Sequence, residues 1–80
     1  MINKEFCKEV RELVEMKIAE LVPDKSYLVK QLIDQDVWEQ LDNGDRRKVG
    51  RIVSALVESQ SLSLVYAGKT SANARQYRLK

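Results

Sequence analysis

The side chains best suited to chemistry in this sequence are cations, and they gather in its second half. Residues 1–41 carry six Lys/Arg and nine Asp/Glu, whereas residues 42–80 carry eight Lys/Arg and three Asp/Glu. Such an asymmetry favours one basic face that meets a polyanion, although an ordinary solvated surface gives the same counts. Seven of these eight cations form two groups, which are Arg46, Arg47, Lys48 and Arg51, and then Lys69, Arg75 and Arg78.

Residues for catalysis or metal binding are scarce. The chain has one cysteine, Cys7, and no histidine, so a thiol nucleophile lacks an imidazole base and a structural zinc lacks ligands. Residues 68–70, Gly-Lys-Thr, match the end of a phosphate-binding P-loop. However, Ser63 stands where that motif needs its first glycine, and a strand is expected to follow instead of a helix. We therefore expect no enzyme, no metal and no cofactor.

Two amphipathic helices are predicted to build the core. The first covers residues 3–21, with Asn3 as its N-cap and Pro23 beyond its end. Its apolar stripe consists of Phe6, Val10, Leu13, Val14, Ile18 and Leu21. The other covers residues 45–59 and follows a turn in which Asp42 or Asn43 supplies the cap. Its inner face consists of Val49, Ile52, Val53, Leu56 and Val57.

The outer face of the helix at residues 45–59 is basic. At about 100° per residue, the positions opposite the apolar stripe are Arg47, Arg51, Ser54 and Glu58, with Lys48 at the flank. Arg46 lies nearer the apolar stripe, where pairing with Asp42 or Asp45 would take it out of this face.

The segment between these helices is predicted to hold a short strand and a short helix. Residues 25–27 are expected to be extended, and residues 28–34 to form a helix with Leu28, Leu32 and Ile33 turned inward. Residues 36–41 are expected to be a link whose tryptophan, Trp38, anchors the core.

The last part of the chain has the pattern of a β-hairpin. Residues 62–66 and 75–79 alternate apolar and polar side chains, and residues 68–73 between them have the composition of a loop. Three helices followed by a hairpin predict an α+β fold, the winged helix-turn-helix, as one domain over residues 1–80. The helix at residues 45–59 is then the recognition helix, and the hairpin loop is the wing.

Four short motifs occur from residue 38 onward. They are W-x-x-L at residues 38–41, G-[DE]-R at 44–46, [LV]-G-R at 49–51 and the hairpin motif GK-[TS]-S at 68–71, with Asn73 to Tyr77 beyond it. In these motifs the chain resembles a family of small, mostly uncharacterised bacterial and phage proteins. The resemblance implies a winged-helix-like fold. It also draws attention to Gly50, a mid-helix glycine explained by a close helix–helix approach or by proximity to a DNA backbone.

Double-stranded DNA is the expected partner, for a small transcriptional regulator or accessory factor. A helix with its side chains fits the roughly 12 Å major groove of B-DNA. Arg47, Arg51 and Ser54 are predicted to enter that groove. Phosphates are predicted to be held by Lys48, Lys69 and Arg75, and the wing offers Lys69, Thr70, Ser71 and Asn73 for backbone or minor-groove contacts.

Other partners remain open. The same basic face would suit an acidic protein surface, in an adaptor or inhibitor that uses the fold without DNA. The acidic first helix could instead serve as a docking or homodimer surface, with Met16 and Ala19 near its edge. Single-stranded nucleic acid would find only Tyr66 and Tyr77 for stacking. Since no apolar run is long enough to span a bilayer, we expect a cytoplasmic protein without a membrane partner.

Overall fold

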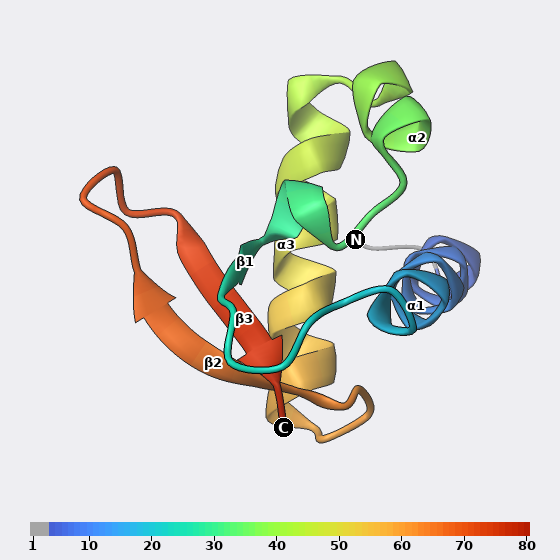
Figure 1. Cartoon of the computed structure of the whole chain (residues 1–80). Coiled ribbons are helices and arrows are strands. Elements are labelled where there is room, and N and C mark those ends of the chain that lie inside the picture. The colour runs from blue at the N-terminus through green and yellow to red at the C-terminus, as the bar shows by residue number, and fades with distance from the viewer. Residues whose placement is uncertain (1–3) are drawn as a thin grey trace.

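Three helices and a three-stranded antiparallel sheet form the part of the chain that the computed structural model describes, residues 4–80 (Figure 1). The order is α1 (Lys4–Ile18), β1 (Tyr27–Leu28), the 3₁₀ helix η1 (Val29–Gln31), α2 (Gln35–Gln40), α3 (Asn43–Glu58), β2 (Leu64–Lys69) and β3 (Arg75–Leu79). The fold is α+β and is compatible with the predicted winged-helix arrangement.

Helix α3 is the central element. It lies between α1 and the sheet, and the loop between β2 and β3 protrudes away from the helices (Figure 1). Its start is fixed by the N-cap Asp42, whose carboxylate accepts a hydrogen bond from Asp45 N at 2.7 Å. The expected inner face is confirmed except for Leu56, which is partly exposed; the buried residues are Val49, Ile52, Val53 and Val57.

Helix α1 packs its apolar stripe against this core. Val10 and Val14 are buried, and Phe6, Leu13 and Ile18 pack around them in a half-buried position. The helix ends at Ile18 and not at residue 21. The predicted cap Asn3 lies outside the described residues.

The second helix is not where the sequence pattern placed it. Residues 28–34 form only the short η1 turn, whereas residues expected to be a link form α2. Asp34 explains the difference, because its carboxylate caps α2 by accepting from Asp36 N at 2.9 Å. Leu32 and Ile33 are buried as predicted, while Leu28 is only half-buried.

Strand β3 is the middle strand of the sheet, paired on one side with β1 and on the other with β2. Tyr77 of β3 lies opposite Tyr27 of β1 and Tyr66 of β2, so three tyrosines form one row across the sheet. The expected extended piece is present as β1, shifted to Tyr27–Leu28. Tyr27 and Tyr77 are buried, and Tyr66 is half exposed.

The wing owes its shape to an irregularity in β2. Between Tyr66 and Gly68 the register shifts, which leaves Ala67 without an opposite residue in β3. Gly68 has a φ of 119°, a backbone conformation that residues with a side chain rarely adopt. A glycine at this position therefore permits the bulge. Strand β2 thereby extends to Lys69, beyond the predicted residue 66, and the loop is confined to residues 70–74.

Trp38 and Arg46 join α2 to α3. The Arg46 guanidinium donates two hydrogen bonds to the Trp38 carbonyl, from Nε at 3.2 Å and from Nη2 at 3.1 Å. The same guanidinium lies 5.2 Å from the centre of the Trp38 ring, within range of a cation–π contact. Trp38 is half-buried and packs at the edge of the core. The side chain of Arg46 contacts Trp38, and not Asp42 or Asp45 as the sequence suggested.

None of the helices formed by residues 4–80 combines the length and the apolar character that a bilayer crossing requires.

Arg46→Ala should destabilise the protein, because it removes both hydrogen bonds to Trp38 and the contact with its ring. We expect the free energy of unfolding to fall by about 1–2 kcal/mol. Arg47→Ala is the matched control, since its side chain is exposed, and should change stability by less than about 0.5 kcal/mol. Urea unfolding of both variants measures the difference, and equal stabilities would contradict this role of Arg46.

Candidate nucleic-acid interface

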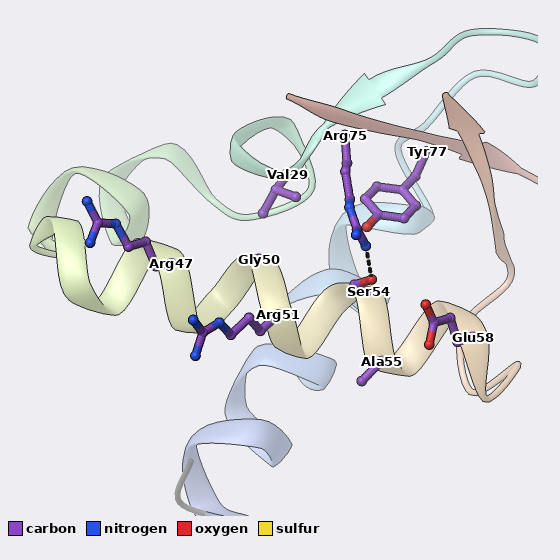
Figure 2. A pocket seen from close by; sticks show the side chains of 9 residues that line it. All are labelled: Val29, Arg47, Gly50, Arg51, Ser54, Ala55, Glu58, Arg75 and Tyr77. Atoms are coloured by element: carbon purple, nitrogen blue, oxygen red, sulfur yellow. Dashed lines mark hydrogen bonds between the residues drawn. The ribbon is translucent and has the colours of Figure 1, made fainter. Parts of the chain in front are cut away.

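A groove runs between the outer face of α3 and the strand β3. Its larger part has a volume of about 610 Å³ and is drawn in Figure 2. Its lining residues are Val29, Arg47, Gly50, Arg51, Ser54, Ala55, Glu58, Arg75 and Tyr77. A second hollow of about 460 Å³ shares four of these residues and adds Val57, Tyr66 and Lys69, which extends the groove toward the hairpin.

Arg47 and Arg51 lie one helical turn apart on this groove. Both side chains are exposed, and Figure 2 shows Arg47 projecting from the N-terminal half of α3 and Arg51 from its middle. Neither has an ion-pair partner within residues 4–80. Two guanidinium groups on an open helix face, with their charge uncompensated nearby, are suited to bind an anion.

Gly50 lies between these arginines, in the wall of the groove. A Cβ built on Gly50 would meet no atom within 4 Å, so space for a side chain is open. The expectation that Gly50 permits a close helix–helix approach is therefore wrong. Since glycine within a helix costs up to about 1 kcal/mol relative to alanine, its presence here has no explanation in the packing of the fold.

Ser54 and Arg75 join the two walls of the groove. The Arg75 Nη1 donates a hydrogen bond to the Ser54 hydroxyl, drawn as the dashed line in Figure 2. The Arg75 guanidinium also lies 6.0 Å from the centre of the exposed Tyr66 ring. In this state Ser54 serves the contact between α3 and β3, and it is half-buried, whereas Arg47 and Arg51 are exposed.

Lys69 and Arg75 place two like charges at the base of the wing. They are directly opposite each other in the register of β2 and β3, and both side chains line the second hollow. Like charges in opposed strand positions repel each other, so this pair disfavours the hairpin unless an anion lies between or near them. Neither takes part in an ion pair of the described structure.

The loop of the wing is organised by Thr70. Its hydroxyl accepts hydrogen bonds from Ala72 N at 3.3 Å and from Ala74 N at 3.2 Å, so both acceptor positions serve the loop. Ser71 and Asn73 are exposed at its tip, where Asn73 adopts φ of 64°. Of the residues predicted for the wing, Lys69, Ser71 and Asn73 present their side chains outward.

Three further charged residues differ in how they relate to the groove. Lys48 lies beside α3 with its Nζ 3.9 Å from Asp45 Oδ1, an exposed pair that contributes little to stability. Arg78 is adjacent to Tyr77 in β3 and so projects from the opposite face of the sheet. Glu58 adds one carboxylate at the C-terminal end of α3, at the far end of the groove from Arg47.

The sequence pattern did not reveal the part of Tyr77 in this groove. Its side chain is 1 % exposed, and its hydroxyl has no hydrogen-bond partner among the described residues. The ring packs edge-on against Tyr66, with ring centres 6.1 Å apart. Because Tyr77 is buried, its ring cannot act as a stacking surface for a base, which leaves only Tyr66 exposed for that role.

A family model described as "Domain of unknown function (DUF1413)" matches residues 12–78. No curated protein and no solved structure matches the chain. The family match begins within α1 and ends within β3, so it includes every residue that lines the groove. The specific motifs noted in the sequence stay a prediction. The chain belongs to this family of DUF1413 domains.

Proposed function

We propose that this protein binds double-stranded DNA, with α3 in the major groove and the β2–β3 hairpin on the adjacent backbone. A small transcriptional regulator or an accessory factor of DNA transactions is the role that fits such a domain best. The support comes from the shape and charge of one face, to which α3 and β3 both contribute.

The observation that carries the proposal is the trio Arg47, Gly50 and Arg51 on the exposed side of α3. The major groove of B-DNA admits an α-helix, and an exposed position without a side chain lets the helix backbone come closer to the groove floor. Gly50 has open space where other residues would place a side chain, which permits that approach. The two arginines beside it can form paired hydrogen bonds with guanine or with phosphates.

The hairpin supplies the second half of the proposed interface. Lys69 is exposed at the end of β2, and Ser71 and Asn73 are exposed at the loop tip, where they can contact phosphates or the minor groove. A phosphate near Lys69 and Arg75 would also relieve their mutual repulsion. Ser54 is a less direct contact than the sequence suggested, since Arg75 already occupies its hydroxyl.

The double variant Arg47→Ala/Arg51→Ala should lose roughly 100-fold in affinity for duplex DNA at low salt, because each guanidinium contact contributes about 1–3 kcal/mol. Fluorescence anisotropy with a labelled duplex measures this loss. The dependence of log K on log salt concentration should become shallower by about 0.9 for each phosphate contact removed.

Arg11→Ala/Arg78→Ala is the matched control, since it removes the same charge from other faces. Arg11 is paired with Glu15 on α1, and Arg78 lies across the sheet from the groove. At about 150 mM salt, where the Debye length is about 8 Å, this control should stay within about threefold of the wild type, because distant exposed charges are largely screened. If both double variants lose affinity equally, only net charge matters and the placement of α3 in the groove is wrong.

Gly50→Ala should separate stability from binding. The free energy of unfolding should rise by about 0.5–1 kcal/mol, since alanine is the better helix former and its Cβ meets open space. Duplex affinity should nevertheless fall several-fold, because the methyl group keeps the α3 backbone away from the DNA. Thermal unfolding and anisotropy on the same samples give both values.

Asn43→Ala is the control for this change. It also replaces one residue of α3 by alanine, but the exposed Asn43 lies outside the groove, so DNA affinity should not change. If Gly50→Ala were more stable and bound the duplex as tightly as the wild type, Gly50 would not face the DNA.

A further inference from the structure

The hydroxyl of Tyr77 is an unfavourable feature of the free protein. Both the residue and its hydroxyl oxygen are buried. Within residues 4–80, no group forms a hydrogen bond with this hydroxyl. A buried polar atom without a partner costs about as much as a lost hydrogen bond. Phenylalanine would fill the same volume without this cost. The packing of the domain therefore does not explain why residue 77 is tyrosine and not phenylalanine.

Tyr77 is placed at the junction of the two hollows of the groove and lines both of them. Figure 2 shows its ring extending from β3 toward α3, with the hydroxyl at the end nearer the helix. Arg75 is two residues earlier on β3, so its side chain leaves the strand on the same face and borders the same space. Arg51 lines the larger hollow from α3, and in the free protein its guanidinium is directed along the helix toward Arg47 (Figure 2). The carboxylate of Glu58 lines both hollows.

We propose that this junction is a binding site for one phosphate group, held by Arg51, Arg75 and the Tyr77 hydroxyl. Two guanidinium groups and one hydroxyl donor match the several acceptor oxygens of a phosphate, and they come from both walls of the groove. The backbone of bound DNA and a small phosphate ester share this chemistry. The first source rests on the proposed DNA-binding function, whereas the second does not.

Binding at this site requires both arginines to move, Arg51 toward the junction and Arg75 away from Ser54. In the free protein the Arg75 guanidinium donates a hydrogen bond to the Ser54 hydroxyl and lies over the ring of Tyr66. A phosphate that enters the junction takes Arg75 from Ser54, and the displaced side chain uncovers the Tyr77 hydroxyl, which then donates to a phosphate oxygen. The unpaired hydroxyl thus gains its partner only in the complex, so the site favours the bound state over the free one.

Tyr77→Phe is the test, with Tyr27→Phe as its matched control. Tyr27 is also a buried tyrosine of the same row, but its hydroxyl accepts a hydrogen bond from Val22 N at 2.8 Å. Tyr77→Phe should raise the Tm by about 4 °C or more while lowering duplex affinity about tenfold. Tyr27→Phe should lower the Tm and leave affinity unchanged.

Salt dependence identifies the kind of contact. Because the Tyr77 hydroxyl is uncharged, Tyr77→Phe should lower affinity without altering the salt slope. Arg75→Gln should make the slope shallower by about 0.9, as expected for one lost ionic contact to a phosphate. A purely structural role of Tyr77 would lower the Tm and the affinity together, which would overturn the proposal.

Inorganic phosphate is the second probe, followed by the backbone NMR signals of Arg75 and Tyr77. If the wild type binds the duplex and Tyr77→Phe binds it equally well, no DNA phosphate occupies the site, and the proposed function stands. If the wild type binds no duplex but phosphate shifts these signals saturably, and not in Tyr77→Phe, the site stands with a small phosphate ester as its ligand. If neither probe distinguishes Tyr77→Phe from the wild type, the site is refuted.

Discussion

The rest of the structure depends on the burial of one face of α3. Val49, Ile52, Val53 and Val57 pack between α1 and the sheet, and this contact fixes the rotation of the helix about its axis. With 3.6 residues per turn, burying those positions leaves Arg47 and Arg51 on the opposite side. The hydrophobic effect thereby determines where the charges lie, although it does not act on them directly.

The groove collects features that are unfavourable in the free protein. Gly50 lowers helix propensity without a packing reason, Lys69 and Arg75 repel each other across the hairpin, and the Tyr77 hydroxyl is buried without a partner. Each feature is local and small. Natural sequences concentrate such exceptions at functional sites, where the selected property is binding and not stability. Their convergence on one face is why the proposals above concern this groove.

Amphipathic patterns predicted the long elements well. The apolar stripes of α1 and α3 and the alternation of the hairpin strands were visible because burial imposes a period on several consecutive turns or residues. Helix α2 was missed because six residues are too few for a period to develop, and its start depends on a single capping contact from Asp34. The extent of β2 was missed because the bulge before Gly68 breaks the alternation.

The candidate site was predicted in outline only. Helical geometry placed Arg47 and Arg51 outward and set Arg46 apart, as the structure also has them. Which polar groups are already occupied could not be predicted, because the Arg75–Ser54 contact joins residues 21 positions apart. The acceptors of Thr70 are engaged by its own loop, and the hydroxyl of Tyr77 is left unpaired, for reasons that exist only in three dimensions.

The central claim is that this face binds duplex DNA through several ionic contacts, and a titration of the unmodified protein tests it most directly. Binding to a labelled duplex would be measured at about 50 mM and about 200 mM salt, with RNA as competitor. Contacts from Arg47, Arg51, Lys69 and Arg75 predict roughly a hundredfold loss of affinity between these conditions, at about 0.9 in slope per contact. The placement of α3 in the major groove also predicts poor competition by double-stranded RNA, whose deep, narrow major groove does not admit a helix. Absence of any complex at the lower salt, or equal displacement by RNA, would contradict the account.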